Sequence, residues 1–331
     1  MSVARGKQKL ALVRRDMPGL NSISSQPARF EEFRGARIAG CVTVTPETGL
    51  LILTLAELGV DLRWCSDNQL ASDDDVVDFL RSEGLAVFAR ANMSRSEYLD
   101  ALERTRRFPD DGGDASIIDD GADLTSYIAE RDPGYMRRVR GITEQTTCGI
   151  AALTKLYARG ATAVPSIDIN GCFTKRHFDN YHGVQESLVR GLMTATGMQL
   201  AGKSASIFGY GPVGQGAATI LRSLGCEVSV VEKDLLKAAH AHYAGFPVRS
   251  AHEAVSRSQL CITATGCEDT ISAALIEQAA DGLMLCNIGH GCREYDVAYL
   301  HEAAQRHVVS PFLELYTFPA ARGSTRCVRE R

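Results

Sequence analysis

The chain has 331 residues, of which 45% are hydrophobic, and its 36 Lys and Arg against 40 Asp and Glu give a net charge of −4. At about one domain per ~150 residues, this length predicts two domains with a core each and excludes a small disulfide-stabilised scaffold. The nearly balanced charge excludes a disordered or fibrous chain and gives no reason to expect a nucleic-acid partner.

No apolar run approaches the roughly 20 residues of a membrane span, so we expect neither membrane insertion nor secretion. The basic first twenty residues leave two interpretations open, an organelle transit peptide and a solvated helix face. Ten cysteines are scattered singly without a C-x-x-C pair, which favours small buried thiols in a reducing compartment over a disulfide framework or a zinc site. We therefore expect a cytoplasmic protein without a metal.

Short β-rich runs alternate with helical patterns from about residue 35, which is typical of parallel sheets covered by crossover helices. The predicted elements of the first half are, in order, a strand over 37–42, a helix over 46–59, a strand over 60–65, a helix from about 72, and strands over 85–88 and 116–118. Asp119 and Asp120 therefore come at the carboxyl end of a strand, where open α/β sheets bind their ligands.

Two polar clusters follow along the chain. Residues 141–147 collect hydroxyls and amides directly before a predicted helix, and alone they indicate a helix cap. In the second cluster Lys175 and Asp179 are spaced i,i+4, so on a helix they share one face and can form one hydrogen-bonded unit. Spacing alone leaves a surface ion pair open as the alternative.

The second half opens with a predicted strand over 204–208 that enters Gly209-Tyr210-Gly211-Pro212-Val213-Gly214, followed by an Ala- and Leu-rich helix and a strand over 227–231. In such a fingerprint the first glycine permits a tight turn, the second lets the backbone approach a pyrophosphate, and the third allows helix and strand to pack closely.

Glu232 follows the second of these strands, where an acidic side chain accepts hydrogen bonds from a ribose diol and repels a 2′-phosphate. This favours NAD over NADP. A Rossmann-like domain that binds no dinucleotide is the alternative.

Further strands are predicted over 260–263 and 283–286. His290 follows the last of them and so belongs to the ligand-binding edge of the sheet, although a structural histidine is the alternative reading. His240 and His242 are interpreted as solvated helix residues, and no third ligand supports a metal there.

Taken together, these segments resemble the S-adenosylhomocysteine hydrolase family. The matching stretches run in family order and are MPGL at 17–20, GARIAGC at 35–41, TPET at 45–48, DDGADLT at 119–125, GITEQTTCG at 141–149, TKRHFDN at 174–180, the glycine fingerprint at 209–214, TATGCED at 263–269 and CNIGH at 286–290.

The resemblance implies an α/β protein of two doubly wound, Rossmann-like domains. These are a substrate-binding domain over 1–183 and an NAD-binding domain over 184–300, followed by a C-terminal tail over 301–331 that lacks the family's usual closing segment. It also implies tightly bound NAD, an adenine nucleoside as substrate, and a homo-oligomer, either a dimer or a tetramer.

The family's reaction is redox-neutral. NAD takes hydride from the 3′ carbon of the nucleoside, the resulting ketone acidifies the 4′ hydrogen, and loss of that proton expels the 5′ substituent to leave a 4′,5′ alkene. In the hydrolase, water then adds and the hydride returns.

Position by position, the resemblance implies a role for each matching residue. Lys175 and Asp179 handle the 3′-hydroxyl proton, Asp120 is the candidate base for the 4′ proton, and His290 lies near the 5′ side of the sugar. The substrate-binding residues implied are Thr45 and Glu47 at the adenine edge, Gln145 at the ribose, and Asn170 and Asn180 near the sugar and nicotinamide. The cofactor-binding residues implied are Thr146, Thr147, Gly209, Gly211, Val213, Gly214, Glu232 and Gly289.

The chain departs from the family pattern mostly in the site. The family usually has Leu-His-Met-Thr where residues 42–45 are Val-Thr-Val-Thr, so Thr43 replaces a histidine that serves the 5′ position. Gln145 replaces a carboxylate that accepts from ribose hydroxyls, and so it can also donate. The sequence also stops at Arg331, where the family continues with a segment that closes over the adenosine and a tail that reaches the cofactor of a neighbouring protomer.

These departures favour an enzyme that keeps 3′-oxidation and 4′,5′-elimination but releases the alkene, a 5′-dehydration in the biosynthesis of a nucleoside natural product. Two alternatives stay open, a hydrolase proper that gives adenosine and homocysteine, and an inactive NAD-binding regulatory homologue.

Overall fold

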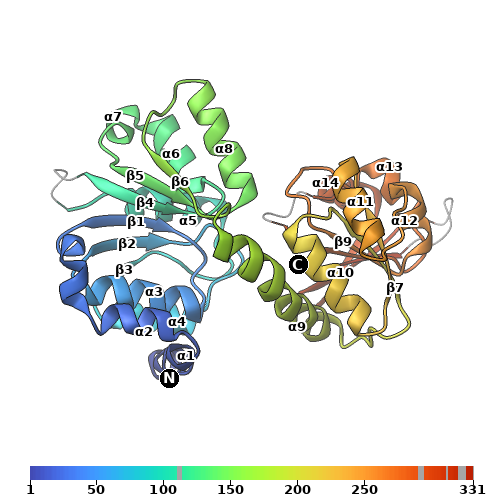
Figure 1. Cartoon of the computed structure of the whole chain (residues 1–331), viewed down its shortest axis with the longest axis horizontal. Helices are drawn as coiled ribbons and strands as arrows, with labels where there is room; N and C mark the ends of the chain where they lie inside the picture. Colours follow the sequence, from blue (N-terminus) through green and yellow to red (C-terminus); the bar gives the residue numbers. More distant parts are fainter. Residues whose placement is uncertain (110–113, 290–293, 311, 320–325, 331) are drawn as a thin grey trace. The chain divides into compact units, whose positions relative to one another are not determined.

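The structure is a computed structural model that describes residues 1–109, 114–289, 294–310, 312–319 and 326–330. The chain divides into two compact units, Met1–Asn170 and Gly171–Arg331, and each is built around a sheet of its own (Figure 1). The domain limits expected from the sequence, 1–183 and 184–300, remain a proposal beside this division.

The sheet of the first unit has six parallel strands. They are β1 (Arg37–Cys41), β2 (Asp61–Cys65), β3 (Ala86–Val87), β4 (Ala115–Asp119), β5 (Gly141–Glu144) and β6 (Ser166–Asp168). Their order across the sheet is β3-β2-β1-β4-β5-β6, so the direction of winding reverses between β1 and β4. Such a switch point opens a crevice at the carboxyl ends of the strands.

Helices cover both faces of this sheet. They are α1 (Ser2–Asp16), α2 (Pro18–Ser24), η1 (Pro27–Phe33), α3 (Pro46–Glu57), α4 (Asp74–Ser82), α5 (Arg95–Arg106), α6 (Asp123–Arg131), α7 (Pro133–Met136) and α8 (Thr147–Ala158). Side chains alternate across a strand, so Ile38 joins the core with α1, α3 and α4, while Ala39 and Cys41 join the core with α5, α6 and α8. The Trp64 ring packs directly on Gly40, where a side chain would not fit because a Cβ would lie 2.1 Å from Trp64 Cε3.

The second unit contains seven strands among the described residues. They are β7 (Ser204–Phe208), β8 (Glu227–Val231), β9 (Leu260–Thr263), β10 (Met284–Asn287), β11 (Gln305–Ser310), β12 (Leu313–Thr317) and β13 (Arg326–Glu330). The order is β11-β12-β13-β10-β9-β7-β8, parallel from β8 to β13 and antiparallel through β12 and β11. A second switch point lies between β7 and β9.

The helices of this unit are η2 (Lys175–Gly183), α9 (Val184–Thr196), α10 (Pro212–Ser223), α11 (Leu235–Tyr243), α12 (Ala251–Arg257), α13 (Ala273–Ile276) and α14 (Val297–Ala303). One core contains side chains of α9 and α10, such as Leu192 and Leu221, and the other contains side chains of α12, α13 and α14, such as Val255, Ile276 and Leu300. Both units are therefore doubly wound α/β folds, which confirms the predicted fold class.

The strands predicted from apolar runs are all present, with ends shifted by a residue or two, as at β3. The expected helix cap before residue 147 is confirmed, since Thr146 caps α8 by accepting from Gly149 N. Among the cysteines whose side chains are described, Cys41, Cys65, Cys226, Cys261 and Cys286 are buried, whereas Cys267 is exposed. Over the described ranges, no helix is both long and apolar enough to cross a bilayer.

Candidate active site

The glycine loop after β7 has the geometry of a dinucleotide-binding turn. Gly209 has φ +96°, a conformation that L side chains rarely adopt. A Cβ on Gly214 would lie 1.9 Å from the carbonyl oxygen of Gly209, so the start of α10 packs directly on the turn. Gly211, in contrast, faces open space, with nothing within 4 Å of an added Cβ. The loop therefore leaves room for a ligand at its second glycine.

The amino end of α10 is free of side-chain caps. Gly211 is its N-cap and Pro212 its first residue, and among the described residues no side chain caps its first turn, to which Val213 and Gly214 belong. By comparison, Thr45, Asp73 and Thr146 cap α3, α4 and α8. Uncapped amides at a helix start are suited to a phosphate group. This site fits the pyrophosphate of NAD.

Glu232 holds the glycine loop to the end of β8. Its Oε2 accepts from Tyr210 N at 2.7 Å and its Oε1 from Asp234 N at 2.9 Å. A carboxylate has about four acceptor positions, so these two bonds leave capacity for a ribose diol. The position agrees with the predicted cofactor role.

We expect Glu232→Ala to weaken NAD binding about tenfold, because a charge-assisted hydrogen-bond acceptor is lost and the loop amide at Tyr210 loses its partner. Binding is measured by titration of protein freed of NAD. NADP binding should weaken less, since the repulsion of a 2′-phosphate is also removed. An unchanged NAD affinity would contradict the assignment of Glu232.

Glu294, which the sequence analysis missed, organises the neighbouring edge of this sheet. Its side chain is buried and accepts from Thr265 N, Thr265 Oγ1 and Gly266 N at 2.6–2.8 Å. A Cβ on Gly289 would lie 1.6 Å from Glu294 Oε1, so the position of this carboxylate leaves no room for a side chain at residue 289. Asn287 also accepts from Gly289 N at 3.0 Å. The predicted site residue His290 lies outside the described residues.

Lys175 and Asp179 are brought together by η2, and the helix expected from their spacing is a π-helix. Lys175 Nζ donates to Asp179 Oδ2, so the predicted hydrogen-bonded unit is present. The lysine side chain is 21% exposed and the aspartate 59%. Asn180 is half-buried on the same π-helix. Stretches of π-helix are rare in proteins, and those that occur are often found at functional sites. The π-helix at Lys175 therefore supports a functional role for this segment.

In the first unit, Asp120 and Gln145 meet at the carboxyl ends of β4 and β5. Gln145 Nε2 donates to Asp120 Oδ2 at 2.7 Å. Asp119, the last residue of β4, is buried beneath them and accepts from Thr125 N and Thr125 Oγ1 at 2.8 and 2.7 Å. Burial raises the pKa of Asp119 to about 8, against the opposing effect of these hydrogen bonds. Asp119 therefore supports the turn, whereas Asp120 lies at the edge.

Glu144 forms a second buried support, which sequence reasoning also missed. It accepts from Ala122 N at 2.9 Å and from Thr146 N and Oγ1 at 2.8 and 2.6 Å. The Thr146 hydroxyl also accepts from Gly149 N, so it is engaged by the protein itself. The Thr147 hydroxyl accepts from Asn170 Nδ2 at 3.1 Å, which places the predicted residue Asn170 beside it.

The last predicted residues of this unit lie at the start of α3. Thr45 is its N-cap and accepts from Thr48 N at 3.3 Å, and Glu47 follows in the first turn. The structure thus brings Asp120, Gln145, Thr146, Thr147 and Asn170 to one carboxyl edge of the sheet and keeps Thr45 and Glu47 at the helix after β1. For Glu144 and Glu294, the only sequence signal was a carboxylate at or shortly after the end of an apolar strand.

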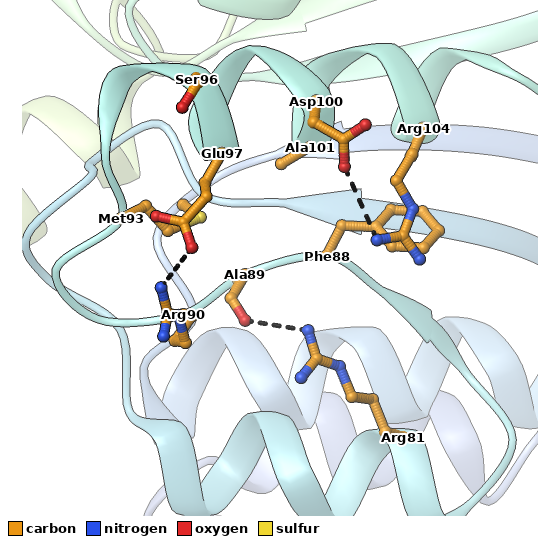
Figure 2. A pocket seen from close by; sticks show the side chains of 10 residues that line it. All are labelled: Arg81, Phe88, Ala89, Arg90, Met93, Ser96, Glu97, Asp100, Ala101 and Arg104. Carbon is orange, nitrogen blue, oxygen red and sulfur yellow. Dashed lines mark hydrogen bonds and ion pairs between the residues drawn. The ribbon is translucent and has the colours of Figure 1, made fainter.

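Of two cavities in the described residues, one lies away from the predicted site residues and the other lies beside Gly289. The larger, of about 450 Å³, lies between α4 and α5 beyond the edge strand β3, and none of the predicted site residues lines it. Figure 2 shows that Arg81 points to the Ala89 carbonyl, Arg90 to Glu97 and Arg104 to Asp100. The smaller, of about 240 Å³, is lined by α9 and by Cys286, Asn287 and Ile288 at the end of β10.

The two doubly wound units and the glycine loop define a dinucleotide-dependent α/β enzyme fold. The family model of the S-adenosyl-L-homocysteine hydrolase NAD-binding domain matches residues 180–325. The model of S-adenosyl-L-homocysteine hydrolase matches residues 1–134. The chain belongs to the S-adenosyl-L-homocysteine hydrolase family, and its cofactor is NAD.

Solved structures with a similar arrangement include a dipicolinate synthase from Bacillus halodurans (10% identity, 82% of this chain and 87% of that chain, TM-score 0.45). The A chain of dipicolinate synthase from Bacillus subtilis is 13% identical, and the match covers 81% of this chain and 85% of that chain with a TM-score of 0.48. Phosphoglycerate oxidoreductase from Vibrio cholerae o395 gives 12% over 66% and 72%, with a TM-score of 0.47.

Proposed function

We propose that this enzyme acts on an adenine nucleoside by transient 3′-oxidation and 4′,5′-elimination of the 5′ substituent, and that it releases the alkene, so that the net reaction is a 5′-dehydration. Such a step belongs to the tailoring of a nucleoside natural product. The observation that carries the proposal is the combination of an NAD-binding glycine loop with the Lys175–Asp179 and Asp120–Gln145 pairs. The two family matches support the NAD-dependent part of it.

Lys175 and Asp179 handle the proton of the 3′ hydroxyl in this proposal. A positive lysine lowers the pKa of a neighbouring hydroxyl, and the aspartate bonded to the lysine holds it in place. NAD, when bound, supplies the hydride acceptor for the 3′ carbon.

Asp120 takes the 4′ proton. A carboxylate at position 145 would lie within hydrogen-bond distance of the Asp120 carboxylate, and two carboxylates at that distance tend to share one proton. The amide of Gln145 instead donates to Asp120 Oδ2, so it orients this carboxylate and competes with it for no proton. The departure from the family at Gln145 therefore suits proton abstraction.

Position 43 has no imidazole in this chain. The Thr43 hydroxyl, at the usual place of the family's histidine, donates to Asp67 Oδ1 at 2.7 Å. In this proposal the 5′ hydroxyl leaves as water with the proton that Asp120 took from the 4′ carbon, and the alkene is released as the product.

The test is to incubate the purified protein with adenosine and, separately, with adenosylhomocysteine, and to analyse the products by mass spectrometry. We expect a product that has lost one water from adenosine, with no net consumption of NAD. Prompt release of homocysteine would show a hydrolase proper. If no adenine nucleoside reduces the bound NAD, the chain is a regulatory homologue. A homo-oligomer, a dimer or tetramer, and a cytoplasmic location remain part of the proposal.

A further inference from the structure

Asp67 comes two residues after the end of β2 and touches Thr43, one of the positions at which the chain departs from its family. Thr43 Oγ1 donates to Asp67 Oδ1 at 2.7 Å, and Ser66 Oγ lies 3.3 Å from Thr43 Oγ1. Asp67 is half-buried, whereas Ser66 is fully buried. A hydroxyl and a carboxylate thus form one unit where β1 and β2 end.

This pair is held by the backbone around it. Val42 N donates to Cys65 O at 3.2 Å, and Trp64 Nε1 donates to Val42 O at 3.0 Å. Ser66 Oγ lies 2.8 Å from Asn68 O and accepts from Asn68 N at 3.1 Å, which fixes the turn that carries Asp67. Because the turn is bonded to the ends of β1 and β2 and Ser66 is buried in it, the position of the Asp67 carboxylate is set before any ligand arrives.

Asp67 also faces the same edge as Asp120. The strands β2, β1 and β4 are neighbours, with Cys41 paired to both Cys65 and Asp119, and Asp120 N donates to Cys41 O at 3.0 Å. Two strand spacings separate the chains that carry Asp67 and Asp120, roughly 10 Å. That width is comparable to the length of a sugar with its 5′ substituent, and the switch point between β1 and β4 lies within it.

We propose that Asp67, positioned by Thr43, is the residue that selects the 5′ substituent of the nucleoside, and that it selects a small group that donates a hydrogen bond, a 5′ hydroxyl. The inference rests on the proposed nucleoside substrate. A carboxylate only accepts, and it has about four acceptor positions in total. A thioether has no hydrogen to donate, and an amino-acid tail brings a second carboxylate.

The test compares the dissociation constants of adenosine and 5′-deoxyadenosine, which differ only in the 5′ hydroxyl, by calorimetry on the NAD-loaded enzyme. We expect the wild type to prefer adenosine about tenfold, as for a hydrogen bond to a charged group. Asp67→Ala should abolish this preference and leave the affinity for 5′-deoxyadenosine unchanged. Asp67→Asn, which keeps the shape, should give an intermediate preference.

Asp61→Asn is the matched control, because Asp61 is at the opposite end of the same strand and half exposed, with Arg37 3.6 Å away. It should preserve the wild-type ratio. An unchanged ratio in Asp67→Ala, or a wild type that binds neither nucleoside or does not discriminate between them, would overturn the inference. The readout is binding, so a protein that discriminates but forms no dehydrated product would refute the proposed function and leave the role of Asp67 supported.

Discussion

Replacing Lys175 by Met or Asp179 by Asn is expected to lower the rate of substrate-dependent NAD reduction by about 10²–10⁴-fold, the usual contribution of a positioned proton-transfer group. Either change breaks the Lys175 Nζ to Asp179 Oδ2 hydrogen bond on η2. The rate is followed at the absorbance of the reduced nicotinamide after mixing with adenosine. The NAD content of the purified variants should remain that of the wild type.

Arg176→Met is the matched control for this experiment, since it removes an exposed cation of the same π-helix next to Lys175. The thermal stability of all three variants should change little, because exposed ion pairs contribute about 0–1 kcal/mol. If the Lys175 and Asp179 variants reduce NAD at the wild-type rate, or if the Arg176 variant loses as much activity, the pair is an ordinary surface ion pair.

Alanine at two neighbouring glycines should weaken NAD binding in both cases but lower the stability of the protein at only one of them. In Gly214→Ala the added methyl would lie 1.9 Å from the Gly209 carbonyl oxygen, so the loop or the helix must shift. We expect a loss of about 3 kcal/mol in the free energy of unfolding, together with loss of NAD binding. Denaturant unfolding and NAD titration measure the two effects.

Gly211→Ala should leave stability nearly unchanged, because its φ of −72° suits any residue and nothing lies within 4 Å of the added methyl. NAD affinity should fall on the order of tenfold or more, since the methyl occupies the space that a pyrophosphate approaches. A Gly211 variant with normal NAD affinity would show that the phosphates do not bind over this glycine, and a stable Gly214 variant would contradict the packing argument.

The glycine loop could be predicted because its requirements are local. The turn at Gly209, the contact with Gly214 and the bond from Tyr210 to Glu232 all follow from one strand–helix–strand unit. The parallel strands could also be predicted from the sequence, because a strand that is buried on both faces consists of a continuous apolar run.

Other features depend on the order of strands in space, which a single sequence does not contain. Glu144 supports a turn that follows β4, and Asp67 meets Thr43 because β1 and β2 are neighbours. The π-helical geometry at Lys175 was also missed, since the i,i+4 spacing suits an α-helix equally well. Sequence reasoning thus found the groups that carry chemistry and missed several of the groups that position them.

The most direct test of the whole account uses adenosine that carries deuterium at the 3′ carbon. If the enzyme oxidises this carbon transiently, a quenched single turnover will show deuterium on the nicotinamide, and the dehydrated product will carry it again at the 3′ position. Formation of the same product with no deuterium ever found on the nicotinamide would contradict the account.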